Sequence, residues 1–323
     1  MLPERDPNPD LALAQRVLDG LVLGTAEAPD VVPIDWAVSV LHTSMGKQTV
    51  IASNVGGGLY VPPTVFVPSG ARLAVVDRAL PMGWAYGFMG WQSPVDILVA
   101  HSEKVSERLA GVSISAIATS DVMGRRPNAV EDFVVVSPTD SLRTGGSAPT
   151  LDGGHQHRLA GLDPDLAQRV AMLDHGGDTG IRLASQISVA VVHAAQEESL
   201  RTDYRLVAVD DVDTLVAVGN GTAVDWKQHY QDAAARENHA MFYPAGKARP
   251  TDLDDSQTSI NIRALYFRYF RMGRIVELVR CWQQHPVNVL DVAYCGHTVG
   301  FGAVVAAVIA EWEQRTNGPL PLR

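Results

Sequence analysis

Two residues near the start of the chain have the spacing of a serine nucleophile and its lysine base. Ser44 and Lys47 fit the S-x-x-K pattern of hydrolases in which the lysine helps to deprotonate the serine. That nucleophile normally opens a buried helix, which Gly46 would weaken. Loose counterparts of the second and third motifs, at residues 120–122 and 143–145, lie too close together for the helical lobe that should separate them. A serine hydrolase using Ser44 and Lys47 is therefore the alternative hypothesis and not the leading one.

Four side chains of the kind that binds zinc lie close together near the end of the chain. They are Cys281, His285, Cys295 and His297, and zinc accepts thiolate and imidazole ligands. Their spacing differs from the short knuckles of structural zinc sites. Cys281 also continues an amphipathic helical pattern, in which cysteine usually serves as a small buried residue. We therefore predict neither a metal site nor a cofactor, and two cysteines exclude a disulfide framework.

A run of three glycines at residues 56–58 could suggest a loop that binds a nucleotide. Such a loop leads into a helix, whereas Pro62 and Pro63 follow this run almost directly. The glycines are therefore predicted to form a turn that requires positive φ angles.

Aromatic residues crowd a short glycine-rich stretch. Trp84, Tyr86, Phe88 and Trp91 lie among three glycines, and tryptophan and tyrosine dominate the energetic centres of protein interfaces. The same rings could instead cap the core of their own domain. We name Trp84, Tyr86 and Trp91 as partner-binding candidates and leave both interpretations open.

The longest helical pattern, residues 259–283, is locally basic within an acidic protein. It carries five arginines, at positions 263, 268, 271, 274 and 280. A row of arginines of this kind is usually a solvated helix face. The alternative is that it serves as a docking surface for an acidic helix or tail of a partner. Arg268 and Arg271 are the candidates on this face.

The elements that must position these residues change in character along the chain. The first part alternates short β-branched runs with Gly, Pro and Ser, which is typical of strands, and a helix is expected over residues 93–111. The strands are predicted at residues 48–52, 64–67, 73–76, 112–118 and 133–136, with residues 36–42 either strand or helix. Asp10 to Asp19 is predicted as a short helix that ends at Gly20.

Helical spacing dominates the second part of the chain. The helices are predicted at residues 163–173, 181–198, 210–218, 223–240, 259–283, 288–293 and 298–315. The resulting fold class is α+β, with a small mixed β-sheet domain followed by a mainly α-helical domain. The expected division is an N-terminal linker and short helix (1–29), an α+β domain (30–145), a linker (146–157) and the helical domain (158–323).

Composition and charge restrict the classes of partner. The chain has 26 basic and 36 acidic residues, a formal charge of −10, which argues against nucleic acid as a partner. Its longest apolar run, residues 299–310, is shorter than the roughly 20 residues that cross a bilayer, so no membrane insertion is predicted. The N-terminus lacks the pattern of a secretory signal, and its prolines suggest the end of a longer arm. We expect a cytoplasmic protein, and self-association stays open.

Two stretches of the first part resemble a known family. Residues 50–58 (VIASNVGGG) and 60–68 (YVPPTVFVP), together with Trp84 and residues 91–94 (WQSP), are similar to mycobacterial domains linked to type VII (ESX) secretion, including the C-terminal region of EspK. The resemblance extends over about residues 30–315. It implies a non-enzymatic adaptor or chaperone that binds a secreted substrate protein, and it supplies no catalytic residue.

Overall fold

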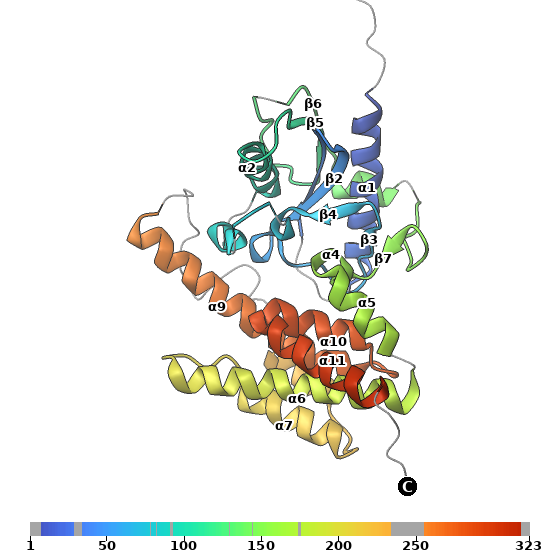
Figure 1. Cartoon of the computed structure of the whole chain (residues 1–323), viewed down its shortest axis with the longest axis vertical. Coiled ribbons are helices and arrows are strands. Elements are labelled where there is room, and N and C mark those ends of the chain that lie inside the picture. The colour runs from blue at the N-terminus through green and yellow to red at the C-terminus, as the bar shows by residue number, and fades with distance from the viewer. Residues whose placement is uncertain are drawn as a thin grey trace, which may run out of the picture. The chain divides into compact units, whose positions relative to one another are not determined.

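The computed structural model describes residues 8–28, 34–77, 79–81, 83–90, 93–128, 130–143, 145–173, 176–233 and 255–317 (Figure 1). The chain divides into two compact units. The first comprises Met1–Leu162 with Ala248–Ala264, and the second comprises Asp163–Lys247 with Leu265–Arg323. The first unit thus takes in both the N-terminal helix and the segment expected to link the domains. The long helix α9 (Gln257–Arg280) contributes residues to both units.

The first unit is built on a mixed sheet of five strands in the order β4-β2-β1-β5-β6. The strands are β1 (Trp36–Thr43), β2 (Gly46–Ser53), β4 (Ala71–Leu73), β5 (Ser113–Thr119) and β6 (Asp132–Val135). The central strand β1 pairs antiparallel with β2 and β5, whereas the outer strands β4 and β6 pair in parallel with their neighbours. A second sheet pairs β3 (Val67–Pro68) with β7 (His155–Gln156). The prediction of a small mixed sheet followed by helices is confirmed.

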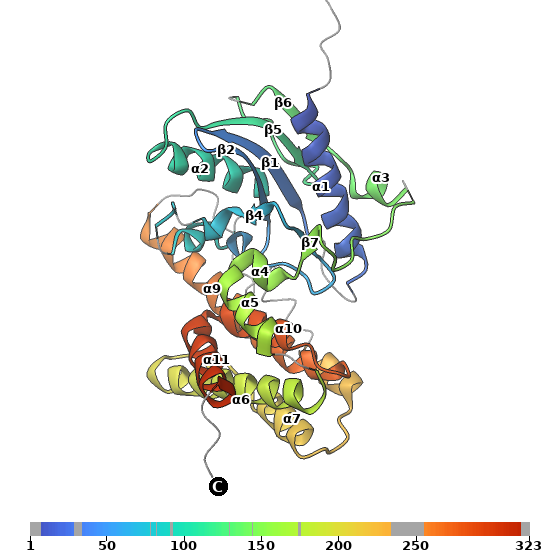
Figure 2. The same cartoon turned by 45° about the vertical axis from the view of Figure 1, so that its right-hand side comes forward.

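Helices cover both faces of the five-stranded sheet (Figure 2). Because side chains alternate along a strand, Ala37 and Leu41 of β1 join the buried cluster beneath α2 (Pro94–Ser106). Trp36, directly before Ala37, points to the other face, where its indole nitrogen donates to Thr25 of α1 (Pro9–Ala26) at 2.9 Å. The central strand is therefore buried on both sides, which explains why its sequence left strand and helix open.

The first helix is longer than predicted, because α1 passes through Gly20 and ends at Ala26. Packing against the sheet outweighs the modest helix-breaking tendency of glycine. Gly24 has a further role, since a Cβ at this position would lie 3.0 Å from the carbonyl oxygen of Thr64. The small residue lets the loop carrying Thr64 approach the helix, and the Thr64 hydroxyl donates to the Gly24 carbonyl at 2.6 Å.

Two predicted strands are wrong in extent. The run at residues 64–67 contributes only Val67 to β3, and the run at 73–76 splits into the end of β4 and a 3₁₀ turn, Ala74–Val76. Pro62, Pro63 and Pro68 lack the backbone N–H that a longer ladder would need. The short helices α3 (Pro138–Arg143) and α4 (Arg158–Leu162) complete the first unit.

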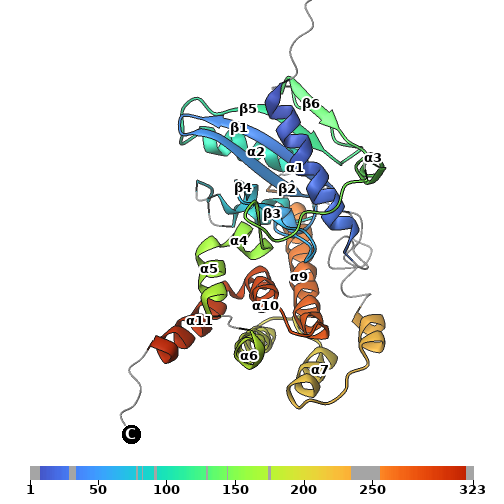
Figure 3. The same cartoon turned by 90° about the vertical axis from the view of Figure 1, so that its right-hand side faces the viewer.

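The second unit is helical, as predicted (Figure 3). Its helices are α5 (Pro164–Leu173), α6 (Gly177–Arg201), α7 (Val209–Gly219), a segment at residues 226–233, the later part of α9, α10 (Val289–Gly296) and α11 (Gly302–Asn317). The long helix α6 packs against α10 and α11. Its fully buried Leu183, Ile187 and Val191 follow the i, i+4, i+8 spacing of a core-facing stripe.

The last two helices are joined by a single π-helical turn, His297–Phe301, in which Gly300 has a φ of 101°. The whole stretch Val289–Arg315 has the length and composition of a membrane-crossing helix, with a mean hydropathy of 1.8 in its most apolar window. Half of that window is buried inside the protein, and the core helix of a globular domain meets the same criteria. The stretch is therefore weak evidence for a membrane span.

Candidate interaction surface

The structure does not assemble the serine–lysine pair of a hydrolase. Ser44 and Met45 form the exposed two-residue turn between β1 and β2. Lys47 returns along β2, and its ammonium group donates to the Asp10 carboxylate of α1. The Lys47 ammonium is therefore bound to Asp10 and is not paired with Ser44.

Asp10 is the centre of a polar cluster that fastens the start of α1 to the sheet. A bulge in β5 leaves Ser115 without a partner in β1, and its hydroxyl donates to Asp10 Oδ2 at 2.7 Å. The His42 Nε2 lies 2.8 Å from the same oxygen. The serine and the histidine of this cluster therefore both contact the same carboxylate oxygen, whereas in a catalytic triad the imidazole lies between the carboxylate and the hydroxyl. The cluster is structural.

The carboxylate of Asp10 is ionised far into the acid range. Burial alone would raise its pKa, but hydrogen bonds from Lys47, Ser115 and His42 outweigh this and lower the pKa to about 2 from an ordinary 3.8. Because the folded pKa is the lower one, the stability that Asp10 supplies is present above pH 3.8 and is lost as the pH falls from 3.8 to about 2.

Asp10→Asn should therefore destabilise the first unit at pH 7 by about 1–2 kcal/mol, after allowance for the solvent around Lys47 and His42. The variant should also lose the part of the acid sensitivity that falls below pH 3.8. Urea unfolding at pH 7 and pH 3 measures both effects. Ser44→Ala, in the exposed turn beside the cluster, is the control and should leave stability unchanged. Equal stability of Asp10→Asn and the wild type at pH 7 would contradict this role.

The predicted aromatic residues lie in and around the 3₁₀ turn Trp84–Phe88. The Trp84 ring packs 4.6 Å from Phe88 and edge-on to His101 of α2, so part of it caps the core. Tyr86 is half-buried, and its burial raises the pKa of its hydroxyl. Trp91 lies outside the described residues. Whether these rings bind a partner stays a prediction.

The basic face predicted on α9 is largely interior. Arg263, Arg271 and Arg274 are 4%, 7% and 0% exposed, so they do not form a solvated row. Of the two arginines chosen as candidates, only Arg268 reaches the surface, with its side chain 34% exposed. It stacks over the Tyr204 ring at 4.0 Å and contacts Asp203 at 3.3 Å. Arg268 therefore keeps its place as a candidate, and Arg271 loses it.

Arg271 instead holds the helical unit together. Its guanidinium binds both carboxylate oxygens of Glu198 on α6, at 2.5 and 2.7 Å. Its Nε donates to the Val299 carbonyl at 2.5 Å, and that carbonyl lies in the π-helical turn between α10 and α11. Gly300, with positive φ, lies beside the same guanidinium. The turn thus presents a backbone acceptor to a buried cation, a local irregularity that sequence spacing did not reveal.

The structure gives the residues considered as zinc ligands different surroundings. Cys281 and Cys295 are both buried free thiols. His297 lies 3.8 Å from Asp163, and burial lowers its pKa while Asp163 acts in the opposite direction. Within the described ranges, no three His, Cys, Asp or Glu side chains form a group that could hold a metal ion.

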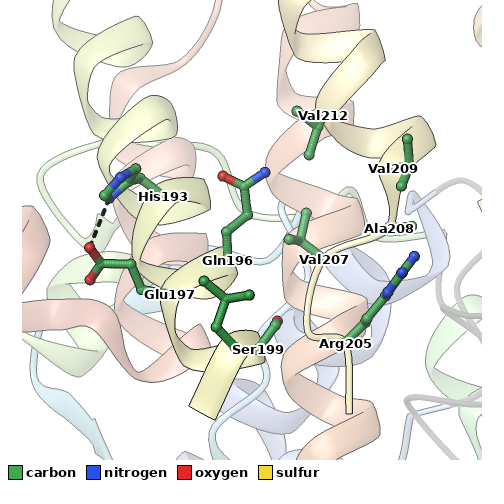
Figure 4. Close-up of a pocket in the computed structure, with 10 residues that line it drawn as sticks. His193, Gln196, Glu197, Ser199, Arg205, Val207, Ala208, Val209 and Val212 are labelled. Atoms are coloured by element: carbon green, nitrogen blue, oxygen red, sulfur yellow. Dashed lines mark ion pairs between the residues drawn. The ribbon is translucent and has the colours of Figure 1, made fainter. Parts of the chain in front are cut away.

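The helical unit has a groove between α6 and α7 with a volume of about 470 Å³ (Figure 4). We call it the α6–α7 groove. Its lining is mainly apolar, with Leu200 on α6, Val207 in the connection between the helices, and Val209 and Val212 on α7. Leu200 is 88% exposed and Val209 is 58% exposed. Polar groups stand at its border, where His193 and Glu197 lie 3.7 Å apart.

The burial pattern of helix α7 is the reverse of that of an ordinary surface helix. All of its residues are described, and the one fully buried side chain is the carboxylate of Asp211, which His229 contacts at 3.1 Å. Its valines are exposed or half-buried instead, with Val216 55% exposed. A surface helix normally buries its apolar stripe and exposes its charges. A contiguous apolar surface left open in this way is typical of an interaction site.

Comparison with known proteins gives a family and no close relative. No curated protein matches the chain. Among solved structures, a fragment of the conserved hypothetical protein Rv3899c from Mycobacterium tuberculosis is similar, with 14% identity and a TM-score of 0.39 over 91% of this chain and 94% of that one. The sequence profile described as the EspK C-terminal domain matches residues 26–272. The chain therefore belongs to the EspK C-terminal domain family, a type VII secretion-associated family.

Proposed function

We propose that the protein is a non-enzymatic adaptor or chaperone in the cytoplasm that binds a secreted substrate protein of a type VII system. The family is associated with this secretion and is not a known enzyme family. The S-x-x-K residues are committed to a hairpin turn and to the Asp10 cluster, which removes the specific basis for the hydrolase alternative.

The single observation that carries the proposal is the reversed burial pattern of α7, which exposes valines and buries a carboxylate. Val209 and Val212 of α7 and Leu200 of α6 line one groove, which suits an apolar helix or extended segment of another protein. Burial of such a segment would be favourable by about 25 cal/mol per Å² of apolar surface removed from water. The mixed charges at the border would orient the segment more than they attract it.

Arg268 extends this surface. It stacks on Tyr204, in the connection between α6 and α7 that also supplies Arg205 and Val207 to the groove. We propose that Arg268 contacts an acidic group of the same partner. Trp84, Tyr86 and Trp91 of the first unit remain proposed contacts of a separate kind, because they lie in the other compact unit.

The test compares full-length variants in a host that carries a type VII system. Leu200→Asp and Val209→Asp together should reduce recovery of the bound secreted protein at least tenfold, because charges would enter an apolar contact. Quantitative mass spectrometry of the co-purified proteins measures the change. A titration with the purified partner then gives the ratio of Kd values.

Met172→Asp is the matched control. Met172 lies on α5 of the same unit and is 58% exposed, the same fraction as Val209, but it is outside the groove. Its partner recovery should equal that of the wild type. If the double variant keeps the secreted partner at the wild-type level, the groove is not the binding site. If no secreted protein is recovered with the wild type, the adaptor role itself is contradicted.

A further inference from the structure

A second hollow lies on the other flank of α6, between α6 and α11. Its volume is about 640 Å³, and we call it the α6–α11 face. Val189, Ala190 and Ala194 line it from α6, and Val304 and Val308 line it from α11. Val189 is 65% exposed, a large fraction for a valine at the centre of a mainly apolar hollow. The α6–α11 face is therefore a second apolar surface that the helical unit does not cover itself.

The charges around this face nearly cancel. Glu197, Glu311 and Arg315 line the hollow, and the exposed Asp178 and Arg182 lie on the same side of α6. These five groups sum to −1, whereas the whole chain carries a formal charge of −10. Two acidic molecules repel each other over most of their surfaces, and a nearly neutral patch is where two copies can meet at least cost. The balance of opposite signs also makes the face complementary to itself.

The order of the charges along α6 specifies how two copies would pair. Arg182, Val189 and Glu197 are spaced i, i+7 and i+15, which places them on one side of the helix. Arg182 and Glu197 lie at equal distances in sequence on either side of the Val189–Ala190 bond. If a second α6 lies antiparallel with that bond on the twofold axis, each Arg182 is opposite Glu197 of the second copy. Val189 then meets its counterpart at the centre.

We propose that the protein forms a twofold homodimer through the α6–α11 face, with α6 antiparallel to α6 of the second copy. His193 and Glu197 border both surfaces, but the dimer is tested on the isolated protein, so its failure would leave the proposed function untouched. A symmetric contact of this kind is self-complementary by construction. The 25-residue helix α6 is about 37 Å long, enough to contribute to an interface of standard size, about 800 Å² per partner.

The first test measures the mass of the full-length protein by light scattering and sedimentation. The wild type should have twice the 34.7 kDa mass of the chain. Arg182→Glu and Glu197→Arg should each weaken the dimer at least fivefold, because each places like charges opposite one another. The double variant should regain most of the wild-type affinity. Within one helix the two positions are about 22 Å apart, so rescue requires the second copy. A monomeric wild type, or a double variant no better than the singles, would overturn the proposal.

The second test uses engineered cysteines and does not depend on charge. Val189→Cys should form an intermolecular disulfide under mild oxidation, because the two copies meet at this position. Leu200→Cys is the control: it is 88% exposed but lies about 16 Å from the axis along the helix, so its counterpart is out of reach. The native Cys281 and Cys295 are buried and should not interfere. Cross-linking of Leu200→Cys as fast as Val189→Cys would refute the proposed register.

Discussion

Arg271→Ala should destabilise the helical unit by about 3 kcal/mol. The substitution leaves the Glu198 carboxylate without its bidentate partner and the Val299 carbonyl without a donor. The Arg271 side chain is 8% exposed, so water cannot replace it freely. Urea unfolding gives the free energy, and hydrogen exchange of α6, α9 and α11 peptides shows which unit loses protection.

Arg268→Ala is the matched control on the same helix. Its side chain is 34% exposed and its partner Asp203 is 87% exposed, so the loss should be at most about 1 kcal/mol. If both variants lost the same stability, burial of Arg271 would not explain its effect.

Acid titration gives an independent check on the same ion pair. The hydrogen bond from Arg271 lowers the pKa of Glu198 below its ordinary value of 4.5, in spite of partial burial. The stability from this pair is therefore present above pH 4.5 and is lost as the pH falls below it. Arg271→Ala should remove this part of the acid dependence. Parallel pH profiles of the variant and the wild type between pH 5 and pH 3 would contradict the assignment.

Gly57→Ala should destabilise the first unit by at least about 3 kcal/mol. Gly57 has a φ of 63°, and a Cβ there would lie 2.3 Å from the Ala85 carbonyl oxygen. The obstacle is backbone, so it cannot rotate away as a side chain could. The substitution would force the glycine turn and the aromatic turn Trp84–Phe88 apart. Urea unfolding and the fluorescence of the first unit's tryptophans measure the change.

Gly83→Ala separates the two causes. Gly83 also has positive φ, 79°, but nothing lies within 4 Å of an added Cβ. This control should cost only the left-handed strain, about 1–2 kcal/mol. A Gly57→Ala variant no less stable than Gly83→Ala would show that close packing of the two turns is unimportant.

Local sequence determined much of the first unit. The β-branched runs at residues 48–52 and 112–118 became β2 and β5, because alternating apolar side chains bury one or both faces of a strand. The prediction that residues 56–58 need positive φ is also confirmed, with values of 61°, 63° and 90°. Only the fold showed why, because the Ala85 carbonyl that excludes a side chain at Gly57 lies 28 residues further along the chain.

The sequence by itself determined the α+β class and the helical second part, because propensity and periodicity act over a few neighbouring residues. It also carried the family, through motifs that resemble it and a profile that matches residues 26–272. Tertiary structure decided the roles of the charged and exposed residues. Lys47 binds Asp10 across 37 positions, Arg271 binds Glu198 across 73, and the valines of α7 remain exposed or half-buried although their spacing fits a buried stripe. A side chain's burial and partners depend on which distant elements the fold brings beside it, and no local pattern contains that information.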